Sequence, residues 1–260
     1  MVTITAEGLG MSYGETEVWK DIDLSIPGPG MVTILGPNGV GKSTFMYCVN
    51  KILEPTSGRV LLDGVDVSEM SHKDIAKLVA YVPQQSNETF AMTVMDTVMM
   101  GRYPHSGYNT SRADMAVAAQ CLKLLRISDL AMRNFNELSA GQHQKVMIAR
   151  GLAQEPDILM LDEPTSNLDI YHQLYVMRML RNIAHRRGIT VLTICHDLNV
   201  AAKYSDRLIM FSKGAVYRDG TVDEVLTPET IMNVYGVETD VMTVDGRPYV
   251  VYHSDMSEDD

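Results

Sequence analysis

Cysteine is scarce in this sequence. Its 260 residues include 3 cysteines, Cys48, Cys121 and Cys195, which are odd in number and far apart. That pattern argues against a disulfide framework and against the closely spaced cysteine pairs of a zinc site. We therefore expect reduced and mostly buried thiols.

Long hydrophobic runs are also missing. No run approaches the 18 or more apolar residues that a bilayer-spanning helix needs, and the opening stretch 1–7 lacks the charged and apolar regions of a signal peptide. We expect the chain to stay in the cytoplasm. Any work at the inner face of the cell membrane would then need a partner subunit.

The sequence is poor in positive charge. Lys and Arg number 22 against 33 Asp and Glu, which gives a formal net charge of -11. Because nucleic-acid binding depends largely on Lys and Arg that neutralise phosphates, this balance argues against nucleic acid as the main partner. A chain of this length is expected to form one substantial core with appended pieces.

Glycine is concentrated in one stretch that matches the phosphate-binding pattern G-x-x-x-x-G-K-[ST]. The stretch consists of Gly36, Pro37, Asn38, Gly39, Val40, Gly41, Lys42, Ser43 and Thr44. In such a loop backbone N–H groups surround phosphate oxygens, and the following helix presents its positive end to the same anion. Lys42 is expected to reach the β and γ phosphates of a nucleotide, and the Ser43 hydroxyl to ligate Mg²⁺. The alternative is an ordinary glycine turn.

Hydrophobic patterning predicts how the rest of the chain is organised. Strands are expected at 2–6, 18–26, 31–35, 59–62, 65–67, 78–82, 158–161, 190–194 and 207–211, and helices at 43–53, 113–125, 142–153, 171–185 and 198–204. Strands that alternate with helices imply a parallel sheet with crossover helices. The strand pattern disappears from 94 to 153, which predicts a helical insertion. Short strands are expected within 237–252, and the acidic end 254–260 is expected to be disordered.

Two carboxylates follow the apolar strand predicted at 158–161. Asp162 is expected to face the phosphate loop, where a carboxylate can hold the Mg²⁺ shell. Glu163 is then placed to polarise an attacking water as general base. An Asp-Glu pair at a strand end is more often a solvated turn, but the phosphate loop in the same chain favours the catalytic interpretation.

A third stretch, Leu138 to Gln142, reads Leu-Ser-Ala-Gly-Gln and lies between the other two. Ser139 is well placed as the N-cap of the helix that follows, so the simplest interpretation is a capped helix with small residues at its start. The order of the three stretches favours a nucleotide-dependent role for this segment. It resembles the ATP-binding-cassette (ABC) ATPases, in which this segment of one subunit closes over ATP held by another.

The resemblance implies a fold and a division of the chain. The fold is the α/β fold of phosphate-loop NTPases, with a RecA-like parallel-sheet core, an antiparallel β subdomain and an inserted α-helical subdomain. The cassette domain would cover 1–236, with the helical subdomain at about 88–153, a short β extension over 237–253 and a disordered acidic tail over 254–260. The resemblance also implies ATP hydrolysis with Mg²⁺ by a homodimer.

The resemblance gives the third stretch its role. Ser139, Ala140, Gly141 and Gln142 would close on the γ phosphate of ATP that a second copy holds. Ala140 stands where the family usually has glycine, and we expect the contact to survive because the change adds only a methyl group. Asp169 lies in a segment that resembles the D-loop, which reaches across the dimer interface.

Three single residues also take roles through the resemblance. His196 matches the switch histidine at the γ phosphate, although a lone histidine is otherwise more often structural. Gln84 matches the glutamine that senses Mg²⁺ and water and links to a transmembrane partner, and the adjacent Gln85 could be confused with it. Tyr13 matches the aromatic residue that stacks on adenine, and a strand aromatic packed in a sheet is nearly as good an interpretation.

The stretch 101–105, Gly-Arg-Tyr-Pro-His, resembles a segment of the cassettes that energise import of iron-siderophore, haem or cobalamin. Those importers pair two cassettes with two permease subunits and an external substrate-binding protein. A surface turn would have a similar composition. The alternative functions are a soluble cassette protein, for example in iron-sulfur cluster assembly, and a plain nucleotide kinase, which would leave the 138–142 stretch unexplained.

Overall fold

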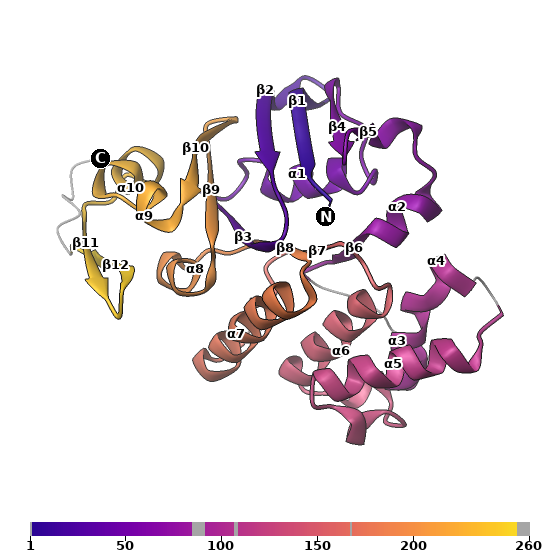
Figure 1. Cartoon of the computed structure of the whole chain (residues 1–260). Coiled ribbons are helices and arrows are strands. Elements are labelled where there is room, and N and C mark those ends of the chain that lie inside the picture. The colour runs from indigo at the N-terminus through magenta and orange to yellow at the C-terminus, as the bar shows by residue number, and fades with distance from the viewer. Residues whose placement is uncertain (1, 85–91, 107–108, 167, 254–260) are drawn as a thin grey trace.

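The computed structural model describes residues 2–84, 92–106, 109–166 and 168–253. At its centre is a six-stranded sheet in the order β10-β9-β3-β8-β7-β6 (Figure 1). These strands are β3 (Gly30–Leu35), β6 (Val79–Val82), β7 (Ile158–Leu161), β8 (Thr190–Ile194), β9 (Arg207–Ser212) and β10 (Ala215–Thr221). Neighbours from β9 through β6 run parallel, and β10 is antiparallel to β9. The predicted parallel sheet is confirmed.

A second, antiparallel sheet has the order β2-β1-β4-β5. Its strands are β1 (Ile4–Tyr13), β2 (Thr16–Ile26), β4 (Ser57–Leu62) and β5 (Val65–Asp66). Helix α1 (Lys42–Val49) buries Phe45 and Met46 in one hydrophobic cluster with side chains from both sheets. The phosphate loop, which leads from β3 into α1, is thereby anchored to two layers.

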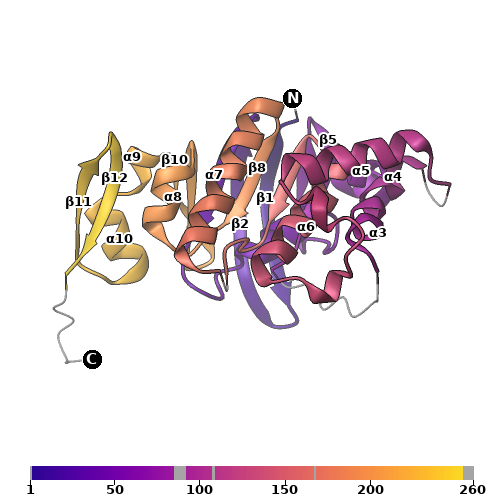
Figure 2. The ribbon, with the colours of Figure 1, turned by 90° about the horizontal axis from the view of Figure 1, so that it is seen from below.

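Helices cover the other face of the parallel sheet. In Figure 2, α7 (Ile170–Arg187) and α8 (Leu198–Tyr204) lie against the strands, and α6 (Ala140–Ala153) follows beside them. Alternation within β8 separates the two faces, because Val191 packs with these helices whereas Leu192 packs with the α1 cluster. All residues of β7 and β8 are buried, as expected for parallel strands covered on both faces.

The insertion is helical where the structure describes it. Residues 92–153 contain α3 (Val94–Met99), α4 (Tyr103–Ser106), α5 (Arg112–Leu124) and α6, together with short 3-10 turns, and their described part contains no strand beyond one isolated bridge between Thr93 and Asn134. The loss of strand pattern after 94 therefore predicted the insertion correctly. The proposed domain limits themselves stay a prediction.

Several predicted boundaries are wrong. The first helix ends at Val49 rather than Leu53, because Lys51 takes a left-handed φ of 53° and the chain leaves the helix. The first strand continues to Tyr13 instead of stopping at Ala6, because register shifts between β1 and β2 interrupt its alternation.

Short elements were missed altogether. These are α2 (His72–Leu78), β10, α9 (Val222–Val225) and α10 (Pro228–Tyr235). At the end of the chain, β11 (Thr239–Val244) and β12 (Arg247–Tyr252) pair as the expected short strands, and 254–260 lies outside the described residues. No helix of the described chain is long and apolar enough to cross a membrane.

The stretch 101–105 is helical rather than a surface turn. Gly101 lies so close to α6 that a Cβ would approach the carbonyl oxygen of Arg150 to 2.2 Å. The buried Arg102 side chain donates to the Asp114 carboxylate at 3.0 Å and to Glu155 at 2.7 Å. This segment therefore ties α5 and the end of α6 together within the insertion.

Candidate active site

Four of the segments predicted to carry chemistry follow four neighbouring strands. β3 leads into the phosphate loop, β8 into His196, β7 into Asp162 and Glu163, and β6 into Gln84. Because these strands are parallel and lie in the order β3-β8-β7-β6, their carboxyl ends meet at one edge of the sheet. The candidate site forms at that edge.

The phosphate loop packs tightly at two glycines. Gly36 has a φ of +142°, and a Cβ there would lie 2.3 Å from the carbonyl oxygen of Phe211. Gly41 has a φ of +90°, and its Cβ would lie 2.4 Å from the Trp19 ring, whose indole N–H donates to the Gly41 carbonyl at 3.3 Å. Only glycine combines this backbone with such close approach, so the shape of the loop depends on both positions.

Lys42 begins α1 with a buried side chain. Its ammonium group donates to the carbonyl oxygens of Gly36 at 2.9 Å and Pro37 at 2.7 Å. Burial lowers the pKa of Lys42, and the neighbouring carboxylates of Glu163 and Asp162 oppose that effect. The cation thus lies between the loop and two carboxylates, where it can meet phosphate charge.

Asp162 is buried at the end of β7 and accepts a hydrogen bond from the Tyr81 hydroxyl at 3.3 Å. Burial raises the pKa of Asp162, the charge of Glu163 adds to this, and a hydrogen bond with Ser43 opposes it. A carboxylate beside a hydroxyl offers the oxygen ligands that Mg²⁺ prefers, and a cation there would favour the ionised form. The donor set fits Mg²⁺.

Protein side chains alone do not complete a metal site. Among the described residues, no group of three or more His, Cys, Asp or Glu could hold an ion. Mg²⁺ commonly takes one or two carboxylates together with substrate phosphates and water. The pair of Ser43 and Asp162 therefore suits a magnesium ion that arrives with a nucleotide.

Glu163 is held at both carboxylate oxygens. Gln84 donates its amide N–H to Oε2 at 2.5 Å, and His196 Nε2 lies 2.5 Å from Oε1. The two partners come from the ends of β6 and β8, on either side of β7. This arrangement fixes the direction of the carboxylate, which a general base requires. Gln85, the alternative to Gln84, lies outside the described residues.

The stretch 138–142 forms the start of α6, as predicted. The Ser139 hydroxyl accepts from the Gln142 backbone N–H at 3.4 Å, and the Gln142 side chain accepts from the Ser139 N–H at 3.0 Å. Ser139 and Ala140 are exposed. The predicted N-cap is therefore confirmed, and it is a reciprocal capping box.

His172 links this stretch to Asp169. A Cβ on Gly141 would lie 3.0 Å from the His172 ring, and His172 Nδ1 lies 2.9 Å from the Asp169 carboxylate oxygens. Asp169 also caps α7. Within this chain, then, the start of α6 contacts the start of α7.

Tyr13 ends β1 beside the first turn of α1. Its hydroxyl lies 3.5 Å from the Thr44 hydroxyl, and the residue is 49% exposed. An exposed ring at this place can stack on a nucleotide base. The sheet-packing alternative does not fit this exposure.

Sequence reasoning missed the residues that shape the site from behind. Trp19 and Phe211 pack on the loop glycines, Tyr81 supports Asp162, and His172 contacts Gly141. Trp19 is the single tryptophan of the chain, which was a usable signal. The others look like ordinary core or helix residues.

The fold and the grouped residues define a phosphate-loop nucleotide hydrolase. A family model described as ABC transporter matches residues 19–166. The chain is 42% identical to an uncharacterised ABC transporter ATP-binding protein of Methanocaldococcus jannaschii, over 96% of this chain and 98% of that protein. It is 38% identical to the iron(3+)-hydroxamate import ATP-binding protein of Bacillus subtilis, over 94% and 91% of the two chains. The hemin import ATP-binding protein of Bordetella avium is 37% identical, over 93% and 95%.

Solved structures agree with these relatives. A metal-chelate type ABC transporter in an inward-facing conformation superposes with a TM-score of 0.84 and 26% identity, over 97% of each chain. A dimeric bacterial ABC transporter cassette gives a TM-score of 0.75 and 30% identity, over 84% of this chain and 98% of the other. The chain therefore belongs to the ABC transporter family, and it is an ATP-binding and ATP-hydrolysing cassette.

Proposed function

We propose that this chain is the ATPase subunit of an importer for a metal chelate, an iron-siderophore, haem or cobalamin. The clamped Glu163 carries the proposal of hydrolysis, because a carboxylate fixed at both oxygens is prepared to orient water. The importer class is supported by the relatives that are named for hydroxamate and hemin import.

The residues in the phosphate-loop half of the nucleotide site have separate tasks. Lys42 and the loop amides bind the phosphates, Ser43 and Asp162 hold Mg²⁺ with help from Gln84, and Tyr13 stacks on the base. Mg²⁺ supplies charge neutralisation on the phosphate oxygens when it is bound. Glu163 accepts the proton of the attacking water, and His196 holds that carboxylate in position.

The site is completed by a second copy of the chain. Ser139, Ala140, Gly141 and Gln142 are exposed or half-buried at the helix start, where the Ala140 and Gly141 amides, which lie outside the capping box, and a positive dipole suit an anion. In a two-fold dimer each such stretch closes on the phosphates held by the other copy, and Asp169 lies at the same interface. A related cassette has been solved as a dimer.

A permease is the second partner. A groove of about 290 Å³ between the core and the insertion is lined by Asn50, Ala76, Val79, Tyr81, Met100, Gly101, Arg150 and Gln154. Met100 is 48% exposed there, and methionine adapts to irregular partner surfaces. We expect a permease segment to bind in this groove, which would hold the chain at the inner membrane face. An external binding protein would act through the permease.

Replacement of Glu163 by Gln tests the catalytic assignment. We expect hydrolysis to fall by roughly 10²- to 10⁴-fold, because the amide cannot accept the proton, while ATP affinity is retained. Phosphate release and fluorescent ATP binding measure the two effects, and gel filtration with ATP and Mg²⁺ reports a trapped dimer. Glu69→Gln, at an exposed position, is the control. Parental turnover in Glu163→Gln would remove Glu163 from the mechanism.

Co-purification tests the transport assignment separately. A stable complex with polytopic membrane proteins supports an importer, and exclusive capture of soluble iron-sulfur assembly proteins would contradict it. The relatives do not favour that soluble role. Phosphate transfer to an added nucleoside monophosphate would instead indicate a kinase.

A further inference from the structure

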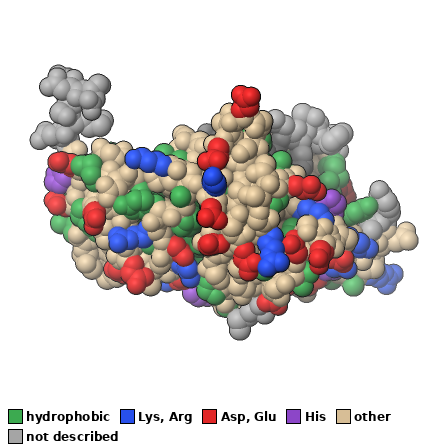
Figure 3. Space-filling view, turned by 90° about the horizontal axis from the view of Figure 1, so that it is seen from above, with side chains coloured by type: hydrophobic (Ala, Val, Ile, Leu, Met, Phe, Trp, Pro, Cys, Tyr) green, Lys and Arg blue, Asp and Glu red, His purple; other side chains and the backbone are tan. Residues whose placement is uncertain are grey.

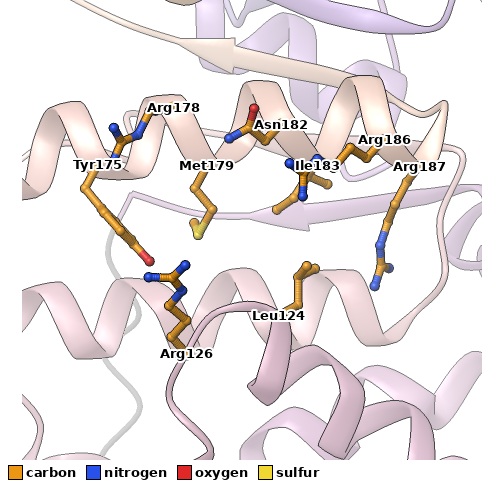
Figure 4. A pocket seen from close by; sticks show the side chains of 9 residues that line it. All are labelled: Leu124, Arg126, Tyr175, Arg178, Met179, Asn182, Ile183, Arg186 and Arg187. Carbon is orange, nitrogen blue, oxygen red and sulfur yellow. The ribbon is translucent and has the colours of Figure 1, made fainter.

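A cavity of about 410 Å³ lies away from the nucleotide site, between α7 and the end of α5 (Figure 4). One wall belongs to the insertion and the other to the core. Its nine lining residues are Leu124, Arg126, Tyr175, Arg178, Met179, Asn182, Ile183, Arg186 and Arg187. The proposed ATPase mechanism uses none of them.

The lining of this cavity is positively charged, whereas the chain as a whole is negatively charged. Its lining contains four arginines and no Asp or Glu, whereas the whole sequence has a net charge of -11. On the face seen in Figure 3, by comparison, acidic and basic side chains are intermixed. Cations gathered around one hollow repel one another, so an anion in it would relieve that repulsion.

Most of these cations have no anionic partner among the residues that the structure describes. Arg126, Arg178 and Arg186 are exposed and form no ion pair within the described part of the chain. Arg187 lies near the buried Cys121 thiol, and its charge opposes the rise of the Cys121 pKa that burial causes. By contrast, Arg181 on the same helix faces Asp206 at 3.9 Å. The cavity arginines therefore keep donors for a ligand.

The walls also suit a ligand of defined chemistry. Figure 4 shows Arg126 and Tyr175 pointing toward one another from opposite walls, while Met179 and Leu124 supply apolar surface between the charges. Guanidinium groups form planar, bidentate hydrogen bonds to phosphate oxygens. Several guanidinium groups around one hollow match a molecule with more than one phosphate group better than a single small anion.

We propose that this cavity is a second anion-binding site, which takes a small soluble molecule with two or more phosphate groups. A bound anion links the insertion, through Arg126, to the core helix that carries Arg186. Lys145 lies 4.6 Å from the Tyr175 ring, which connects the same cavity to α6 and hence to Ser139. The ligand thus bridges the two parts of the chain that each hold half of the proposed ATP site.

Titration with inorganic tripolyphosphate tests the site. The experiment uses the 260-residue chain with the substitution Lys42→Ala, so that the phosphate loop contributes little to binding. Calorimetry compares this chain with versions that add Arg126→Ala and Arg186→Ala together, or Arg181→Ala as a control from the same helix. We expect the arginine pair to weaken binding at least roughly tenfold and Arg181→Ala to leave it unchanged. Higher salt should weaken binding in the parent.

Three results would overturn the proposal. They are no tripolyphosphate binding in the Lys42→Ala chain, equal affinity in all versions, and equal weakening by Arg181→Ala. Vesicles with anionic lipid form a separate arm, since they offer the same phosphate chemistry on a membrane. Vesicle binding that needs Arg126 and Arg186, without tripolyphosphate binding, would assign the arginines to a membrane surface instead. Melting curves verify that each version folds.

Discussion

The two halves of the proposed ATP site differ in how they are built. The phosphate loop is fixed from behind, because Gly36 and Gly41 lie against Phe211 and Trp19. The Ser139 half is an exposed helix start, whose described hydrogen bonds are those of a local capping box. The shape of the first half therefore depends on tertiary packing, whereas the second half takes its shape mainly from its own helix and has one close tertiary contact, between Gly141 and His172. From this difference we infer that the first half binds the nucleotide within one chain, and that the second half acts only when it meets a nucleotide held by a second copy.

Among the substitutions that test how each half is shaped, Gly41→Ala should have the largest effect, because it disturbs the packing behind the phosphate loop. The new methyl group would collide with the Trp19 ring at 2.4 Å in a backbone with φ +90°, and the loop would have to move. A displacement of about 1 Å costs on the order of a hundredfold in rate. Gly39→Ala is the matched control, since Gly39 also has positive φ but its Cβ would meet nothing within 4 Å. Equal losses in ATPase assays would show that backbone strain, rather than Trp19, sets the loop.

Mixing two inactive variants tests whether the two halves of one ATP site come from different copies of the chain. Lys42→Ala disables the phosphate loop, and Ser139→Asp places a negative charge where the γ phosphate would approach. If the halves come from different copies, a mixed dimer has one intact site, and an equimolar mixture should recover about a quarter of parental ATPase activity. A mixture as inactive as its components would mean that each chain uses its own Ser139.

Much of the fold was predictable, because the hydrophobic pattern of several segments matches the secondary structure that these segments adopt. The strands at 158–161 and 190–194 and the helix at 198–204 have the predicted bounds. The first strand was cut short because its register shifts hide the alternation. Helix α10 has readable boundary signals in Thr227, Pro228 and Gly236, but eight residues give too little periodicity to stand out.

The site was predictable where function fixes the residue type and spacing. The loop and the carboxylates after β7 meet as expected, because parallel strands bring their ends to one edge. The clamp of Gln84 and His196 on Glu163 was not predicted, since strand order cannot be read from one sequence. Tyr81 and Trp19 escaped for another reason: their positions follow from tertiary contacts between distant segments.

The insertion that carries the exposed half has its own anchor, which Asp114→Asn should loosen. Hydrogen bonds from Ser111 and the Arg102 guanidinium hold the pKa of Asp114 at about 2, below its ordinary 3.8. A lowered pKa means that the carboxylate stabilises the fold above its ordinary pKa and loses that effect as pH falls through about 2. We expect Asp114→Asn to lower the Tm at pH 7 by roughly 2 to 4 °C for each kcal/mol of stability lost, the scale for a chain of this size, and the difference to shrink below pH 4.

Asp74→Asn is the control for that experiment. Asp74 also bonds to a capping serine, Ser71, and has a lowered pKa, but it is exposed and its ion pair is with the exposed Lys77 at 3.4 Å. Its replacement should change the Tm less. Equal shifts in the two variants would mean that the cap, and not Arg102, anchors the insertion.

The smallest expected effect is a change in stability at Ser139, and it distinguishes the role of this residue as a helix N-cap from its role as a phosphate ligand. As an N-cap, Ser139→Ala should cost about 1 kcal/mol of unfolding free energy, whereas Ser139→Asp keeps a good cap and should leave stability near the parental value. As a phosphate ligand, Ser139 cannot be replaced by Asp, because two anions would then meet at the start of α6. Denaturant melts and ATPase rates on the same samples distinguish these cases. A fully active Ser139→Asp variant would reduce this stretch to a helix start, and the second half of the site would have to lie elsewhere.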